Sequence, residues 1–205
     1  MEKVLKYETG PKDRYAGLAL NTGSAGTIAA GDYLKRLFPT SKIVASEALQ
    51  CPTLLQNGFG AHRIEGIGDK HIPWIHNIRN TDLVTAIDDN AVVQIARLFN
   101  EESGQDMLQK QGVPEDMILK LSLFGFSGIG NMLSAIKFAK YYELTSNDIV
   151  LTVLTDSMDM YGTRIEEYRQ EYGEFDENAA AQAFGRYLMG ERTDNMLELS
   201  YADRK

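Results

Sequence analysis

The chain has 205 residues, enough for one sizeable hydrophobic core, and its 43% hydrophobic and 24% charged residues are ordinary for a globular protein. The formal net charge of −8 argues against nucleic acid or an anionic membrane as a partner, because both need a basic surface. A single cysteine excludes an internal disulfide, and we find neither a signal-like segment nor a run long enough to span a membrane. We therefore expect a cytoplasmic protein.

Strand-like and helical segments alternate along the chain. Apolar runs predict strands at Gly17–Asn21, Lys42–Ser46, Ala61–Glu65, Leu83–Ile87, Leu119–Phe124 and Ile149–Leu154. Amphipathic stretches predict helices at Thr27–Phe38, just after Cys51-Pro52, at Asn90–Glu102 and at Asn131–Tyr142. This alternation is typical of an α/β protein with a mainly parallel sheet and flanking helices.

The last third of the sequence has a different pattern. Two helices are predicted at Tyr161–Tyr172 and Asn178–Met189, followed by a polar tail from Tyr201 that we expect to fray. The polar segment Ser103–Glu115 is expected to be a surface excursion. Without a linker or repeat, residues 1–205 are interpreted as one α/β domain.

The sequence Gly23-Ser24-Ala25-Gly26-Thr27 lies between a predicted strand and a predicted helix. Backbone N–H groups at a helix start are unpaired, and the helix dipole adds positive potential, so this turn suits a phosphate group. It could equally be a tight turn capped by the Thr27 hydroxyl.

Three types of phosphate loop are possible here. A P-loop requires a lysine and then a hydroxyl residue after the second glycine, but Thr27-Ile28 stands there. A dinucleotide fingerprint is weakened because Asn21 occupies the place of its first glycine, although Glu47 lies at a suitable distance downstream. The third is a compact cup for one phosphate monoester, closed by Thr27.

Further motifs follow in a fixed order. They are His62-Arg63-Ile64-Glu65-Gly66-Ile67-Gly68 with Ile72-Pro73, then Asp82–Asp88, Gly125-Phe126-Ser127-Gly128, and Asp156-Ser157-Met158-Asp159-Met160-Tyr161. From about Ala16 to about Ile165 the series resembles the second half of the fold-type II pyridoxal-phosphate (PLP) enzymes, which include cysteine synthase and cystathionine β-synthase. The resemblance implies most of the large domain of a tryptophan-synthase-β-like fold. Residues 166–205 would then be additional helices and a tail.

The resemblance also implies roles for individual residues. Gly23, Ser24, Ala25, Gly26 and Thr27 stand where this family holds the cofactor phosphate. Ser157 stands where cystathionine β-synthase-like members place a serine on the pyridine nitrogen, a neutral contact that suits β-elimination and β-replacement. Pocket-lining positions are matched by Gly66, Ile67, Gly68, Gly125 and Ser127.

Two expected features of the family do not occur in the sequence. The Schiff-base lysine belongs to a Ser-x-Lys segment upstream of the phosphate loop; here Lys42 directly follows Ser41 and Lys137 is three residues after Ser134. A Thr/Ser-Gly-Asn loop for the substrate carboxylate is also missing. We therefore expect the carboxyl-terminal part of such an enzyme, with no catalytic residue in this chain and with an amino-terminal partner chain or missing half.

The implied reaction is α,β-elimination or β-replacement on an amino-acid substrate, as in cysteine synthase, with PLP as cofactor and a homo-oligomer as the complete enzyme. The insertion at Ser103–Glu115 and the bulky Phe126 also leave open a different lyase or a carbon–carbon-cleaving enzyme. A non-catalytic subunit that binds a phosphate ligand or a partner chain is the alternative of a different class.

The remaining polar residues have ordinary interpretations. His62, His71 and His76 lack the spacing of a metal site, so no metal is expected, and His62 is interpreted as a strand residue beside the site. The acidic pairs Asp88-Asp89 and Glu101-Glu102 are expected to cap a helix or face solvent. Trp74 is expected to pack in the core or in an interface, and Cys51 has no evident base.

Overall fold

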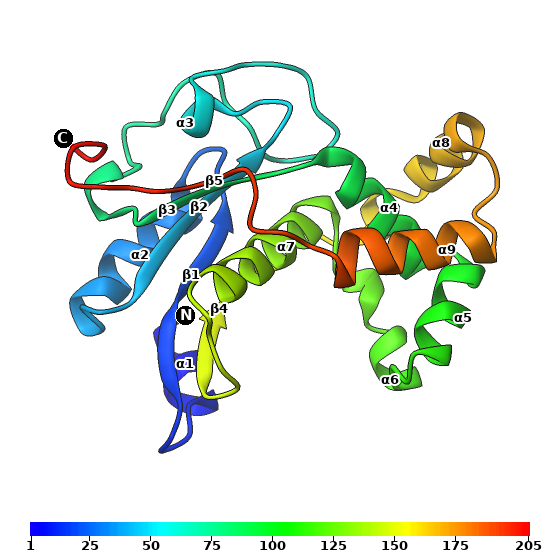
Figure 1. Cartoon of the computed structure of the whole chain (residues 1–205), viewed down its shortest axis with the longest axis horizontal. Coiled ribbons are helices and arrows are strands. Elements are labelled where there is room, and N and C mark those ends of the chain that lie inside the picture. Colours follow the sequence, from blue (N-terminus) through cyan, green and yellow to red (C-terminus); the bar gives the residue numbers. More distant parts are fainter.

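The computed structural model describes residues 1–205 and is built around a five-stranded sheet of order β4-β1-β2-β3-β5 (Figure 1). β1 pairs in parallel with both β2 and β4, β2 pairs in parallel with β3, and β5 runs antiparallel along β3. The strands are β1 (Arg14–Asn21), β2 (Lys42–Ala48), β3 (Leu83–Ile87), β4 (Asp148–Leu151) and β5 (Met196–Glu198). The predicted α/β class with a mainly parallel sheet is confirmed.

Helices cover both faces of this sheet. α2 packs on β1 and β2 on one face, whereas α7 crosses β1, β2 and β3 on the other (Figure 1). The α-helices are α1 (Glu2–Glu8), α2 (Gly26–Leu37), α3 (Thr53–Gln56), α4 (Asp89–Asn100), α5 (Glu102–Lys110), α6 (Glu115–Ile118), α7 (Phe126–Tyr141), α8 (Gly162–Tyr172) and α9 (Glu177–Ala183). Short 3₁₀ turns form at Ile78–Asn80, Leu121–Leu123 and Met158–Met160, and a π-helical turn at Phe184–Met189 continues α9.

An irregularity in β1 sets which side chains face which helix layer. The pairing of β1 with β4 shifts between Tyr15 and Gly17, so one extra residue enters the strand there. As a result Tyr15 and Leu18 both face the α2 layer, whereas Ala16 and Ala19 both face the α7 layer. The alternation expected of a regular strand resumes after Gly17, whose missing side chain allows Lys42 of β2 to approach closely.

Two predicted strands are wrong because the sheet has no place for them. Residues 61–65 form an irregular loop, since β2 and β3 pair directly with each other and leave no edge free between them. Residues 119–124 contain only the turn Leu121–Leu123, and the side chains of Leu119 and Leu123 are exposed. β4 is also shorter than predicted and ends at Leu151.

The segment expected to be a surface excursion is instead helical. Ser103–Glu115 contains most of α5, which packs on α4 and α9 and contributes the buried Leu108 to the largest hydrophobic cluster. In the tail, Arg204 donates a hydrogen bond to the carbonyl oxygen of Leu199 at 3.0 Å and pairs with Asp82 at 3.3 Å. The helix at 102–110 and the contacts of Arg204 both depend on tertiary packing that polar composition does not reveal.

Other expectations for charged and aromatic residues are partly wrong. Asp88 caps α4 by accepting from the Asn90 N–H at 3.1 Å, as expected, but the neighbouring Asp89 is buried and accepts from the Arg63 N–H at 3.0 Å. Trp74 is fully exposed and so is not a core residue of this chain.

Glu101 was expected in solvent but is buried in an ion-pair cluster. Its two carboxylate oxygens accept from Arg97 Nε at 2.6 Å and from Arg169 Nε at 2.8 Å, which joins α4 to α8. The guanidinium of Arg97 is itself buried, donates to the Gly173 carbonyl oxygen at 2.8 Å and stacks over Phe175. The buried carboxylate of Glu101 and the buried guanidinium of Arg97 therefore each neutralise the charge of the other.

No single helix in the structure is long and apolar enough to cross a membrane. Residues 115–123 and 126–141 reach that composition only when they are taken together, across a bend of 115°.

We predict that Glu101→Gln lowers the free energy of unfolding by about 3 kcal/mol, because it leaves the buried Arg97 guanidinium without its counter-charge. Urea unfolding of the variant and of wild type measures this difference. The matched control is Glu102→Gln, at an exposed position one residue away, which should change the unfolding midpoint very little. Equal midpoints for the two variants would contradict the stabilising role of the buried pair between Arg97 and Glu101.

Candidate functional site

The loop Gly23–Thr27 lies at the carboxyl end of β1 and leads directly into α2. Ala25 adopts the left-handed conformation with φ of 60°, which turns the chain from the strand into the helix. None of the backbone N–H groups of residues 23–28 has a hydrogen-bond acceptor within the chain, and neither do the Ser24 and Thr27 hydroxyls. The loop therefore gathers unpaired donors at the positive end of a helix dipole.

The two competing interpretations of this loop lose support. α2 begins without a side-chain cap, so the Thr27 hydroxyl does not cap the turn. The Glu47 carboxylate is buried and accepts from the N–H groups of Leu54 and Leu55, both at 2.8 Å, which occupies the acidic group that a dinucleotide site would need. Burial raises the pKa of Glu47, and the hydrogen bonds from the backbone act in the opposite direction.

The second glycine loop lies directly against the first. The Gly68 N–H donates to the Thr22 carbonyl oxygen at 3.0 Å, and a side chain on Gly23 would touch Gly66 and Ile67 at 3.5 Å. A side chain on Gly68 would collide with the imidazole of His62, and its φ of 90° also favours glycine. The structure thus brings Gly23–Thr27 and Gly66–Gly68 together, with His62 beside them in a loop rather than in a strand.

Asn21, the last residue of β1, joins the loop to the beginning of α7. Its side-chain N–H donates to the Ser127 carbonyl oxygen at 2.7 Å, and its backbone N–H donates to the Asn131 side chain at 2.6 Å. The amide of Asn131 in turn donates to the Val153 carbonyl oxygen at 2.7 Å. A side chain at position 130 would come within 2.7 Å of the Asn21 amide nitrogen, which explains why Gly130 lies there.

The turn at Gly125–Ser127 meets the segment that follows β4. The Asp156 carboxylate accepts from the hydroxyls of Ser127 at 2.7 Å and Tyr161 at 2.8 Å, and the Gly125 N–H donates to the Asp156 carbonyl oxygen at 3.1 Å. Burial, followed by the hydrogen bond to Asp156, raises the pKa of Tyr161 to about 12. Ser157 comes next along the chain, and its hydroxyl donates only to Asp159, at 3.2 Å.

The Gly23–Thr27 and Gly66–Gly68 loops and the Gly125–Ser127 turn therefore lie near the carboxyl edge of the sheet, linked through Thr22, Asn21 and Ser127. This is the edge at which α/β proteins bind their ligands. Ser157 forms no hydrogen bond to these loops or to the turn. Three residues of the site were not predicted as part of it: Asn21, Asn131 and Asp156. Asn21 gave a signal in the sequence, since it replaced the glycine expected in a dinucleotide loop, but only the fold reveals its partners.

The arrangement can bind an anion without using a cationic side chain. Backbone N–H groups, two free hydroxyls and the dipole of α2 converge at one end, which is the chemistry that favours a phosphate group. In the second glycine loop the backbone is open to a ligand at Gly66, where no atom lies within 4 Å of the place that a side chain would take.

Sequence comparison finds relatives among the cysteine synthases. No protein-family model matches the chain. It is 29% identical over 140 residues to cysteine synthase B of Campylobacter jejuni, covering 68% of this chain and 40% of that protein. It is 26% identical over 167 residues to the cysteine synthase of Staphylococcus aureus, covering 78% of this chain and 48% of that protein.

Solved structures show the same fold. A hydrogen sulfide-producing enzyme from Fusobacterium nucleatum matches with a TM-score of 0.63 and 22% identity, over 97% of this chain and 52% of that one. O-acetyl serine sulfhydrylase isoform 3 from Entamoeba histolytica matches with a TM-score of 0.62 and 20% identity, over 89% of this chain and 48% of that one. The chain spans about half the length of the relatives it matches. Sequence and fold together confirm the resemblance of this chain to part of the fold-type II pyridoxal-phosphate enzymes of the cysteine synthase group.

Proposed function

We propose that this chain forms the PLP-binding part of an enzyme that acts on an amino acid by β-replacement or α,β-elimination. The observation that carries the proposal is the set of unpaired N–H groups at residues 23–28, together with the free hydroxyls of Ser24 and Thr27. A phosphate group is the ligand that such an array binds best. The similarity to cysteine synthases supports PLP as the molecule that carries this phosphate.

Each element of the site would have a distinct task. The Gly23–Thr27 loop would bind the phosphate, and the Gly66–Gly68 loop beside it would border the ligand. Ser157 would place a neutral hydroxyl at the ring nitrogen, and Asp156 would hold the adjacent turn through Ser127 and Tyr161. When bound, PLP would supply an electron sink for reactions at the α and β carbons of an amino acid.

The neutral character of the Ser157 contact matters for the proposed chemistry. A hydroxyl does not enforce a proton on the ring nitrogen as a carboxylate would, so the cofactor remains a moderate electron sink. The nearby Asp156 carboxylate could act as such a carboxylate, but it already accepts from the hydroxyls of Thr155, Ser127 and Tyr161. These three hydrogen bonds occupy the Asp156 carboxylate within the protein.

The relatives are about twice as long as this chain, which supports a second polypeptide segment in the working enzyme. We propose that this segment, as a partner chain or a missing half, brings the lysine that attaches PLP and the loop that binds the substrate carboxylate. The complete enzyme would be a homo-oligomer in the cytoplasm, where free amino acids are available. The alternative of a different class, a subunit that binds a phosphate ligand but catalyses nothing, shares the same loop.

We predict that Thr27→Val and Ser24→Ala each weaken PLP binding by about tenfold, because each removes a hydroxyl donor to a charged phosphate oxygen. Titration of the chain with PLP, followed by the visible absorbance of the bound cofactor, measures the affinity. Thr40→Val is the matched control, since Thr40 is exposed at the opposite edge of the sheet. Wild-type affinity in both loop variants would contradict the phosphate assignment.

Ser157→Ala should shift the absorbance maximum of bound PLP and weaken its binding by about fivefold, because the ring nitrogen loses its hydrogen bond. The spectrum of the saturated variant is compared with that of Ser200→Ala, which alters an exposed serine in the tail. If the spectrum and the affinity of Ser157→Ala equal those of wild type, the ring nitrogen has another partner.

Borohydride treatment of the PLP-loaded chain should leave no lysine carrying a stoichiometric cofactor-derived group, since the expected Ser-x-Lys segment does not occur among these residues. Peptide mapping by mass spectrometry detects such a group and its position. Stoichiometric modification of one lysine would show that this chain contains the attachment site, and the proposed need for a second segment would then be wrong.

A further inference from the structure

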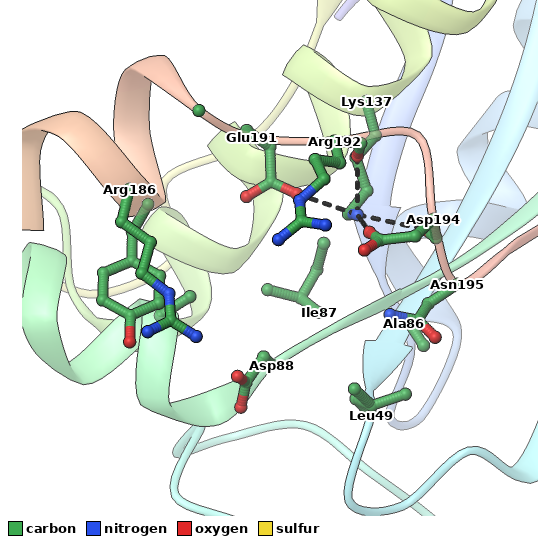
Figure 2. Close-up of a pocket in the computed structure, with 13 residues that line it drawn as sticks. Leu49, Ala86, Ile87, Asp88, Lys137, Arg186, Glu191, Arg192, Asp194 and Asn195 are labelled. Atoms are coloured by element: carbon green, nitrogen blue, oxygen red, sulfur yellow. Dashed lines mark hydrogen bonds and ion pairs between the residues drawn. The ribbon is translucent and has the colours of Figure 1, made fainter.

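The carboxyl-terminal segment returns along the edge of the sheet beside β3 and forms one side of an open cavity at the carboxyl end of β3. The cavity has a volume of about 150 Å³ and lies between the end of β3, the first turn of α4 and residues 186–195 (Figure 2). Its apolar surface comes from Leu49, Ala86, Ile87 and Ala91. It shares no residue with the Gly23–Thr27 loop or with the Gly66–Gly68 loop.

A buried lysine fixes the wall of this cavity. Lys137 of α7 is only 3% exposed, and its Nζ pairs with Glu191 at 2.8 Å and with Asp194 at 2.9 Å. The same Nζ donates to the Arg192 carbonyl oxygen at 2.8 Å. Two carboxylates therefore face the single positive charge of Lys137, and the backbone around Arg192 is held in place.

Two exposed arginines at the rim of the cavity, Arg186 and Arg192, have no acidic partner. Figure 2 shows the side chains of Arg186 and Arg192 reaching towards the same space, and neither forms an ion pair or a hydrogen bond through its guanidinium. The Arg186 guanidinium stacks on the ring of Tyr187, with 5.0 Å between Cζ and the ring centre, which limits its freedom. Tyr187 is itself fixed by a hydrogen bond from the Asn90 amide at 2.9 Å.

A carboxylate borders the cavity across from these cations. Asp88 uses one oxygen, Oδ1, to accept from the Gln50 amide at 2.9 Å and from the Asn90 N–H at 3.1 Å. Its second oxygen, Oδ2, accepts no hydrogen bond within the chain. Asp88 can therefore bind a cation without losing its role as the cap of α4.

We propose that this cavity binds a free α-amino acid. The guanidinium groups of Arg186 and Arg192 would bind the carboxylate, for which their planar donors are suited, and Asp88 Oδ2 would bind the ammonium group. The volume of about 150 Å³ is sufficient for a small amino acid. This site does not depend on PLP or on the proposed reaction.

NMR on the full chain tests the proposal, because the Nε–Hε signals of arginine report on each guanidinium separately. Arg186→Gln and Arg192→Gln assign the two signals by their disappearance. The probes are L-serine, acetate as a carboxylate without an amine, and ethanolamine as an amine without a carboxylate. The signal of Arg36, an exposed arginine on α2, serves as the internal reference.

L-Serine should shift the Arg186 and Arg192 signals and leave the Arg36 signal unchanged, acetate should shift the same pair at higher concentration, and ethanolamine alone should shift neither. Each arginine variant should weaken L-serine binding by about tenfold, whereas Arg36→Gln should not. Asp88→Asn keeps the capping oxygen and should weaken L-serine binding by about tenfold while leaving acetate binding unchanged.

Two results would overturn the proposal. If L-serine shifts neither arginine signal at concentrations up to the millimolar range, the cavity is not an amino-acid site. If Asp88→Asn leaves the affinities for L-serine and acetate equal to those of wild type, the cavity binds only an anion. Repeating the titration in Thr27→Val separates this proposal from the cofactor proposal, since the arginine shifts should persist in that variant.

Discussion

The side chain of Asn21 connects the sheet to α7, and the arrangement of the candidate site depends on this contact. Its amide donates to the Ser127 carbonyl oxygen, and its backbone N–H donates to Asn131, so the end of β1 and the first turns of α7 are fixed relative to each other. The Gly23–Thr27 loop begins two residues later. This connection, together with the packing of α7 on the sheet, sets the spacing between the Gly23–Thr27 loop and the Gly125–Ser127 turn.

The buried position of Asn21 makes the contact stringent. Asn21 is 7% exposed, and burying its Nδ2 donor without an acceptor is costly, so α7 must present the Ser127 carbonyl oxygen at this point. The same contact requires a glycine at position 130, one turn further along α7, because a side chain there would occupy the space of the Asn21 amide. Sheet and helix thus constrain each other through polar groups in addition to hydrophobic packing.

A second constraint concerns charge. The protein carries a net charge of −8 and has no cationic side chain bonded to the Gly23–Thr27 loop, so any anion at this loop would be bound by backbone dipoles and hydroxyls. Glu47 is the acidic residue that a dinucleotide-binding loop would use. Its carboxylate instead accepts hydrogen bonds from the N–H groups of Leu54 and Leu55. The negative charge of Glu47 therefore does not offset the positive potential at the start of α2.

The sequence predicted those parts of the fold that depend on local periodicity. β1, β2 and β3 and the helices α2, α4 and α8 have the expected positions within a few residues. The strand predicted at 61–65 was wrong because Ile64 is a single buried apolar residue in a loop, and a short alternating pattern does not reveal whether a sheet edge is available. The helix α5 was missed because its buried positions, Gly104 and Leu108, are few and its remaining residues are polar.

The candidate site was predictable where a motif is continuous in sequence and not where it depends on contacts between distant segments. The Gly23–Thr27 loop has its chemistry within five residues, and its free N–H groups follow from a strand that leads directly into a helix. Asp156 and Ser127 are separated by 28 intervening residues, and no local pattern indicates that their side chains meet. Long-range hydrogen bonds of this kind require the fold.

The carboxyl-terminal segment is required by the rest of the molecule rather than added to it. β5 covers the edge of β3, which would otherwise present unpaired backbone groups. Lys137 lies on α7, the same helix that Asn21 fixes, and its buried ammonium group would have no counter-charge if residues 191–194 were displaced. The sequence of α7 therefore contains, at Asn131 and Lys137, polar groups that specify both the sheet contact and the docking of the carboxyl-terminal segment.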